Sequence, residues 1–200
     1  MIQVGEEAPD FEMEGVMGRE FMKARLSDYR GKWLVLFFYP LDFTFVCPTE
    51  IKGFTKRHKE IEDVNGQVLG VSVDSKYSHL AWVDDIGEQA YPLLSDITKE
   101  VSLDYEALIE DQGIAQRATF IIDPQGIVRW LVVSDLNVGR SVEETVRVLM
   151  ALQTGELCPG RPNCSQPLWS AAAGRRFVFR PRIMTSKRQT HLSAIDKAKS

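Results

Sequence analysis

Cysteines are the side chains of this 200-residue chain best suited to covalent chemistry, and they stand at positions 47, 158 and 164. An odd number of cysteines argues against a static disulfide framework. In a reducing compartment, cysteines serve as packing residues, metal ligands or redox centres. Cys158 and Cys164 are too far apart for a CxxC pair, and the three histidines are scattered along the chain. We therefore expect no metal site, and Cys47 is the candidate for a reactive thiol.

Cys47 lies where a buried strand passes through a short loop into a helix. The apolar run WLVLFFY at 33–39, which ends at Pro40, predicts the strand, and residues 48–62 predict the helix, with Pro48 at its first position. A helix N-terminus presents unpaired amide donors and the positive end of the helix dipole, and both favour a thiolate. The thiolate is the form of cysteine that attacks an electrophile, so Cys47 is placed to act as a nucleophile.

The neighbours of Cys47 support this interpretation without excluding a simpler one. Thr44, three residues earlier, can direct its hydroxyl at the same point, and Pro40 and Pro48 can hold the loop and restrict the access of water. A cysteine within an apolar stretch is, however, often an inert packing residue. From the residues alone, both interpretations of Cys47 remain open.

The rest of the chain predicts a sheet that is covered by helices. Strands alternate with helices and are followed by a hairpin around the turn sequence DPQG, which indicates an α/β or α+β fold. Ser141 and Glu144 fit a capping box at the start of the last helix. The further elements predicted are a strand at 67–73, a helix at 77–85, hairpin strands at 118–122 and 127–133, and a helix at 141–154.

Charge divides the chain into two parts. Residues 1–158 hold 15 Lys/Arg and 27 Asp/Glu, a net charge of −12, whereas residues 159–200 hold 9 Lys/Arg and one acid, a net charge of +8. We expect an acidic domain followed by a basic tail that is partly disordered. The apolar runs are too short for a membrane helix and the first residues lack the features of a secretory signal, so we expect a cytoplasmic protein.

The segment PLDFTFVCPTE at 40–50 resembles the active-site segment of the peroxiredoxins, whose pattern is Pro-x-x-x-Thr/Ser-x-x-Cys. The resemblance extends over residues 1–159, and it is closest to the typical 2-Cys group, which includes the alkyl hydroperoxide reductase C subunits. It implies a thioredoxin-like α/β fold with a central mixed sheet flanked by helices, formed by residues 1–158. Further matching segments are GVSVDSKYSHLAW, PLLSD, RATFIID, DLNVGRSVEET and GELCP.

The same resemblance implies a role for seven residues. Cys47 matches the peroxidatic cysteine and Cys158 the resolving cysteine. Glu50 and Arg140 match a supporting pair that orients an arginine of the active site. The catalytic residues that it implies are Cys47, Thr44, Pro40, Arg117 and Cys158.

The resemblance also implies a reaction and partners. Cys47 attacks a peroxide and becomes a sulfenic acid, which condenses with Cys158 of a second subunit to a disulfide. An external dithiol, either a thioredoxin-like protein or a flavoprotein disulfide reductase, then reduces the disulfide. We expect a homodimer, or a ring of five dimers, that needs no cofactor. Antioxidant defence and redox homeostasis are the implied physiological roles.

The chain departs from the family after Cys158. The Trp-Lys-Pro-Gly segment of relatives is missing, so residues 159–200 are either an extension of this lineage or the product of a shifted reading frame. The Gly-Gly-x-Gly and Tyr-Phe motifs of easily overoxidised members are also missing. A peroxide sensor, or a holdase chaperone on the same fold, remains an alternative function. A thioredoxin-type disulfide reductase needs a CxxC pair at the helix start, but in this chain Cys47 is followed by Pro48, Thr49 and Glu50. Binding of nucleic acid by the basic tail is a weak alternative, because it rests on charge alone.

Overall fold

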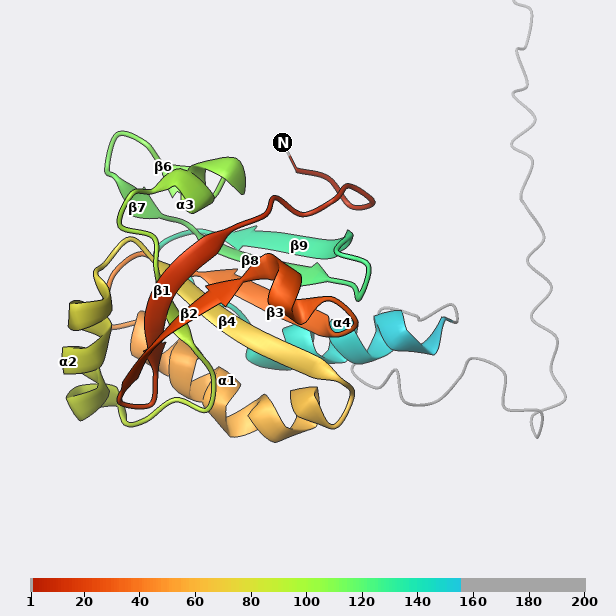
Figure 1. Cartoon of the computed structure of the whole chain (residues 1–200), viewed down its shortest axis with the longest axis horizontal. Helices are drawn as coiled ribbons and strands as arrows, with labels where there is room; N and C mark the ends of the chain where they lie inside the picture. The colour runs from red at the N-terminus through yellow and green to blue at the C-terminus, as the bar shows by residue number, and fades with distance from the viewer. Residues whose placement is uncertain (1, 156–200) are drawn as a thin grey trace, which may run out of the picture. The chain divides into compact units, whose positions relative to one another are not determined.

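A seven-stranded sheet forms the centre of residues 2–155, which are the part of the chain that the computed structural model describes. The predicted tail at 159–200, together with Cys158 and Cys164, lies outside the described residues. The strand order is β2-β1-β5-β4-β3-β8-β9 (Figure 1). The strands are β1 (Glu12–Met17), β2 (Glu20–Arg25), β3 (Trp33–Phe38), β4 (Gly66–Ser72), β5 (Leu93–Ser95), β8 (Arg117–Ile122) and β9 (Val128–Ser134).

The sheet is mixed, with parallel strands at its centre and antiparallel strands on both sides. Strands β3, β4 and β5 run parallel, while the remaining neighbours pair antiparallel. Parallel neighbours require a crossover connection. Helix α1 (Cys47–Glu62) supplies it between β3 and β4, and helix α2 (Lys76–Ile86) lies in the connection from β4 to β5.

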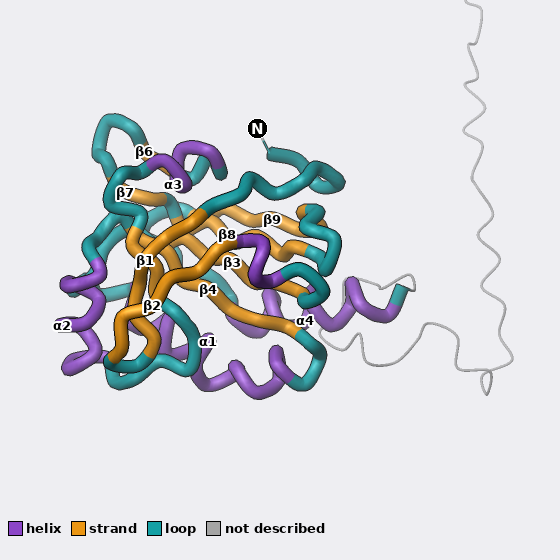
Figure 2. The backbone as a smooth tube through the Cα atoms, in the orientation of Figure 1, coloured by secondary structure: helices purple, strands orange, loops and turns teal. Residues whose placement is uncertain are grey.

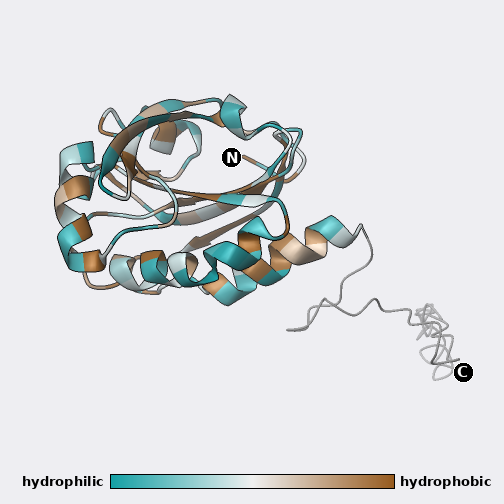
Figure 3. Ribbon diagram, turned by 60° about the horizontal axis from the view of Figure 1, so that its bottom comes forward, coloured by the Kyte–Doolittle hydropathy of each residue, from teal (hydrophilic) through white to brown (hydrophobic). Residues whose placement is uncertain are grey.

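Helices and loops cover both faces of the sheet (Figure 2). Helix α1 and helix α4 (Val142–Thr154) lie side by side on one face, as Figures 1 and 3 show from two directions. The N-terminal residues, helix α3 (Glu100–Asp104) and the short ribbon of β6 (Leu108–Ile109) and β7 (Ile114–Ala115) contribute to the core on the other face. A short 3-10 helix over Leu26–Tyr29 precedes β3.

Strand β3 is buried on both faces, which explains why its sequence is one uninterrupted apolar run. Leu34, Leu36 and Phe38 pack into the core on one face of the sheet, whereas Val35 and Phe37 pack into the core on the face of α1 and α4. Successive side chains of a strand point to opposite faces, and both faces are buried here. The strand lies between β4 and β8 in the sheet, and the loop before Cys47 follows its C-terminal end.

The predicted fold class is confirmed, and the predicted elements are present with ends that differ by no more than one residue. The sequence did not predict β1, β2, β5, α3 or the β6–β7 ribbon. The predicted capping box is only half formed. Ser141 Oγ accepts a hydrogen bond from the Glu144 backbone N–H at 3.2 Å, but the Glu144 carboxylate pairs with Arg147 instead of returning to the helix start. None of the helices in residues 2–155 is long and apolar enough to span a membrane.

Candidate active site

Cys47 is the first residue of α1, and its side chain is fully buried. The helix begins one residue earlier than predicted, so Pro48 occupies the second helical position and Cys47 the first. Pro48 has no N–H to satisfy in this first turn, where N–H groups lack partners within the helix. The backbone N–H of Thr49 donates to the Val46 carbonyl at 3.0 Å and closes the turn. The predicted placement of the cysteine at a helix start is confirmed.

Arg117 approaches Cys47 from the neighbouring strand β8. This strand runs antiparallel to β3, with Phe37 opposite Thr119, so its first residue lies beside the end of β3 where the active-site loop begins. Arg117 Nη1 donates to Cys47 Sγ at 3.4 Å and to Glu50 Oε2 at 2.8 Å. The Arg117 Nε–H donates to the Leu136 carbonyl at 2.9 Å. These three contacts hold the guanidinium against the thiol.

Glu50 connects the two buried arginines. It follows Cys47 by three residues on α1, so both side chains lie on the same face of the helix. Glu50 Oε2 accepts from Arg117, while Glu50 Oε1 accepts from the backbone N–H and from Nε of Arg140 at 2.8 and 3.0 Å. Both carboxylate oxygens are therefore used, and the structure brings together the two residues that the sequence predicted as a supporting pair.

Arg140 is buried beneath the active site and belongs to the loop before α4. Its guanidinium lies over the Phe37 ring, with 5.2 Å between the Cζ atom and the ring centroid. Nη2 donates to the Phe38 carbonyl at 2.5 Å. Burial lowers the pKa of Arg140 from its ordinary value, although the charge and hydrogen bonds of Glu50 act to raise it. The neighbouring Gly139 allows this loop to approach α1, because a Cβ atom there would lie 3.3 Å from Val46 Cγ1.

Glu50, Arg117 and Arg140 form a charged cluster that carries one net positive charge when all three side chains are ionised. A buried charge without compensation is costly. A thiolate on Cys47 would bring the total charge of these three side chains and Cys47 to zero. The charged cluster is therefore complementary to the thiolate form of Cys47.

Thr44 and Pro40 complete the loop between β3 and α1. Pro40 is buried, and Thr44 is half-buried. The Thr44 hydroxyl donates to the Leu41 carbonyl at 3.0 Å. Among the described residues no hydrogen bond joins it to Cys47, which differs from the orientation that the sequence suggested. The hydroxyl finds an acceptor three residues earlier because the loop turns tightly there. A catalytic role for Thr44 stays a prediction.

Sequence reasoning missed a buried polar network that ties the active-site loop to α2. Asp42 accepts hydrogen bonds from Tyr39 Oη at 2.9 Å and from Ser78 Oγ at 2.8 Å, and its other contact is His79 Nδ1 at 2.7 Å. The Asp42 backbone N–H donates to Asp74 Oδ2 at 2.7 Å. The sequence feature that could have indicated this network is His79, a histidine on the apolar face of α2.

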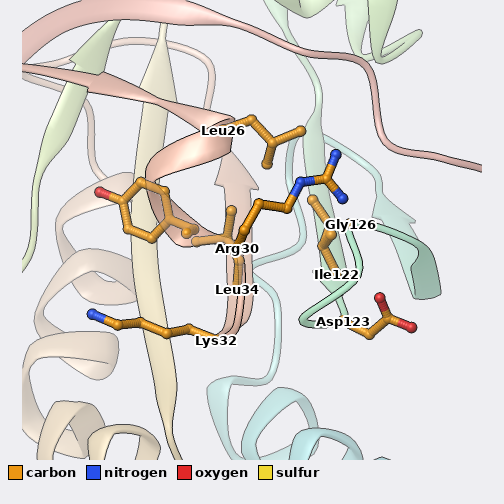
Figure 4. Close-up of a pocket in the computed structure, with 8 residues that line it drawn as sticks. Leu26, Arg30, Lys32, Leu34, Ile122, Asp123 and Gly126 are labelled. Carbon is orange, nitrogen blue, oxygen red and sulfur yellow. The ribbon is translucent and has the colours of Figure 1, made fainter.

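A small pocket at the other end of the sheet is separate from Cys47. It lies beside Leu34 at the start of β3 and Ile122 at the end of β8, with the Arg30 side chain over Gly126 (Figure 4). The charged cluster lies at the opposite ends of the same two strands. Within residues 2–155, no three His, Cys, Asp or Glu side chains are grouped so that they could hold a metal ion.

The fold and the site together define a class of thiol-based enzymes, in which a cysteine at a helix start on a thioredoxin-like sheet carries the chemistry. Residues 4–131 match the model of the AhpC/TSA family. A putative peroxiredoxin of the rubredoxin operon in Clostridium pasteurianum is 56% identical over 78% of this chain and 92% of its own length. The chain belongs to the AhpC/TSA family and is a peroxiredoxin, a thiol peroxidase.

Two further similarities agree with this assignment. The mitochondrial thioredoxin-dependent peroxide reductase of Drosophila melanogaster is 52% identical, and the match covers 81% of this chain and 74% of the relative. The crystal structure of reduced 2-Cys peroxiredoxin from Plasmodium vivax matches with a TM-score of 0.76 and 45% identity, over 79% of this chain and 88% of that one. The predicted family is therefore confirmed.

Proposed function

We propose that this peroxiredoxin reduces hydrogen peroxide and small organic hydroperoxides with Cys47 as the nucleophile. The observation that carries the proposal is the contact between Cys47 Sγ and Arg117 Nη1 at 3.4 Å, made where α1 begins. A thiolate there is stabilised by the helix N-terminus and by a permanent positive charge. The same charge also lies beside the position that a peroxide takes during attack.

The first step transfers one oxygen atom to sulfur. The Cys47 thiolate attacks the terminal oxygen of the hydroperoxide, the O–O bond breaks, and the electron pair leaves with the second oxygen. That oxygen takes a proton and departs as water or an alcohol, and Cys47 becomes a sulfenic acid. None of the described residues accepts a hydrogen bond from Nη2 of Arg117, so its N–H groups remain for the peroxide. They would stabilise the negative charge that grows on the departing oxygen.

The second step forms a disulfide with Cys158 of a partner subunit, and water leaves. A disulfide needs Cα atoms about 4.4–6.8 Å apart. Because Cys47 is fully buried in the first turn of α1, this turn and the loop before it must open first. The resolving role of Cys158 rests on the family resemblance, since Cys158 lies outside the described residues. The same step requires at least a homodimer, and a ring of five dimers satisfies it too.

The third step returns both cysteines to thiols by exchange with an external dithiol, which is oxidised in turn. A thioredoxin-like protein is the preferred reductant in this proposal, and the name of the thioredoxin-dependent relative from Drosophila melanogaster supports it. A flavoprotein disulfide reductase is the alternative. A reducing cytoplasm is the compartment in which this cycle fits the cysteine content of the chain.

The test measures peroxide consumption together with the redox state of the cysteines. Purified protein is mixed with one equivalent of hydrogen peroxide or of tert-butyl hydroperoxide, and the decay of peroxide is followed by stopped flow. Non-reducing electrophoresis of the same samples reports disulfide-linked dimers. We expect rapid decay and a dimer band for the wild type, and neither for Cys47→Ser with an unchanged circular dichroism spectrum. Turnover by Cys47→Ser at more than a few per cent of the wild-type rate would assign the chemistry to another group.

A further inference from the structure

Thr119 places a hydroxyl in the core, next to the charged cluster. It is the third residue of β8 and is completely buried. The alternation of side chains along the strand puts it on the same face as Arg117 and Ile121, and its register partner on β3 is Phe37. Burying a hydroxyl is unfavourable unless it is hydrogen-bonded. The reason for a threonine at this position must therefore lie in its partner.

That partner is Arg140, whose Nη1 donates to Thr119 Oγ1 at 2.9 Å. A guanidinium has five N–H donors. Arg140 Nη1 donates to Thr119 Oγ1 and to the Ala118 carbonyl, and Nη2 donates to the Phe38 carbonyl and, at 3.5 Å, to Glu50 Oε2. The fifth N–H, on Nε, donates to Glu50 Oε1. All five donors are used.

The acceptors around Arg140 fall into three kinds. Two are backbone carbonyls that the strands β3 and β8 hold in place, and Glu50 is the carboxylate of the charged cluster. The Thr119 hydroxyl is the remaining acceptor, and it is the one that a single substitution removes without touching the charged cluster. Its loss leaves a buried N–H of a charged group without a partner, which is the expensive case. The guanidinium would then have to turn toward another acceptor.

A rotation of the Arg140 guanidinium would affect Cys47 indirectly, because Glu50 and Arg117 connect the two residues. Glu50 Oε1 is bound by Arg140 and Glu50 Oε2 by Arg117 Nη1, the same nitrogen that donates to Cys47 Sγ. Any displacement of the carboxylate therefore changes how Arg117 meets the thiol. The planar fork of each guanidinium makes these contacts sensitive to rotation.

We propose that Thr119 is a positioning residue for peroxide reduction, whose hydroxyl orients Arg140 so that Glu50 holds Arg117 against Cys47. The inference rests on the proposed function, because it assigns Thr119 to the step that Cys47 performs. Thr119 acts on Cys47 through Arg140, so it shapes the reactivity of the thiol and the orientation of Arg117.

The test compares two substitutions of Thr119 with one substitution of a second buried threonine. Thr119→Val removes the hydroxyl at nearly constant shape, and Thr119→Ser keeps it. Thr145→Val is the matched control, because Thr145 is equally buried but its hydroxyl donates to the Ser141 carbonyl within its own helix region. Two rates are measured for each variant: the reaction of Cys47 with hydrogen peroxide by stopped flow, and its alkylation by iodoacetamide over a range of pH.

We expect Thr119→Val to slow the peroxide reaction by roughly tenfold, the effect of losing one hydrogen bond to a charged group. The pH profile of alkylation should shift in the same variant, while Thr119→Ser and Thr145→Val keep the wild-type values. If Thr119→Val does not fold, the comparison of Thr119→Ala with Thr119→Ser replaces it.

Three results would overturn the inference. One is a folded Thr119→Val with wild-type rates in both assays, another is an equal loss in Thr119→Ser, and the third is an equal loss in Thr145→Val. Should the wild type fail to consume peroxide, the proposed function is wrong. The alkylation profile then still decides whether Thr119 acts on the reactivity of Cys47.

Discussion

Replacing Arg117 by lysine keeps the positive charge but removes the geometry of the active site. Arg117 uses Nη1 for Cys47 Sγ and the Glu50 carboxylate, and Nε for the Leu136 carbonyl. A lysine has one nitrogen in place of three, so it cannot keep these contacts and also offer a donor to the peroxide. Losing one donor aimed at developing charge costs about 2.7–4 kcal/mol. At about 1.4 kcal/mol per factor of ten, Arg117→Lys should slow the peroxide reaction by roughly a hundredfold to a thousandfold.

The assay is the second-order rate constant for peroxide with the pre-reduced enzyme, measured by stopped flow. Arg129→Lys is the matched control, because Arg129 on β9 pairs with Asp123 at 2.6 Å and has no part in the charged cluster. We expect the control to react at the wild-type rate, and the thermal unfolding of both variants should show that they are folded. An unchanged rate constant in Arg117→Lys would refute the role given to the guanidinium fork, and a loss of similar size in the control would show that any arginine change is harmful.

Three further predictions follow from the charges and cysteines. Glu50→Gln removes the only carboxylate of the charged cluster, so the free energy of unfolding in urea should fall by about 3–5 kcal/mol; an unchanged value would contradict the charge balance. Cys158→Ser should abolish the disulfide-linked dimer after oxidation and Cys164→Ser should keep it; a dominant Cys47–Cys164 peptide in mass spectra would reverse these roles. Burial acts to raise the pKa of Asp123, but hydrogen bonds from two backbone N–H groups and an arginine outweigh it and lower the pKa from 3.8. Because the folded-state pKa is the lower one, Asp123 stabilises the fold above about pH 4, and this contribution is lost as the pH falls through the folded-state pKa. The difference in melting temperature between wild type and Asp123→Asn should therefore shrink toward acid pH, and a constant difference from pH 7 to pH 2 would contradict the assignment.

The elements that the sequence predicted best are those whose pattern is strong over a short stretch. Strand β3 is apolar along its whole length, and α1 begins at a proline-marked turn and shows a helical period. The hairpin of β8 and β9 surrounds a turn sequence. Each of these patterns involves only residues that are neighbours in the chain, so the element can be predicted without knowledge of the fold.

The missed elements have weak local patterns. Strand β5 has three residues and α3 five, which is too short for a period to show. Strand β2 lies at the edge of the sheet, and its residues are mostly exposed, so it lacks the alternation of a half-buried strand. These elements are held by pairing with β1 and β4 and by packing, which are contacts between distant parts of the chain.

The orientation of side chains around Cys47 also depends on the fold. The Thr44 hydroxyl turns to the Leu41 carbonyl, a choice that a pattern of residue types does not contain. Likewise, Asp42 and His79 are separated by 37 residues and meet only because α2 packs beside the active-site loop.

The sequence by itself determined that a cysteine stands at a helix start and that the residues around it belong to the peroxiredoxin pattern. These are properties of one segment of chain, where spacing alone decides which groups are neighbours. Only the tertiary structure decided that Arg117 and Arg140, 67 and 90 residues from Glu50, share its two carboxylate oxygens. The physical reason is that a buried charge must be balanced by groups in contact with it. The antiparallel pairing of β3 with β8 brings Arg117 to Glu50, and the loop before α4 brings Arg140.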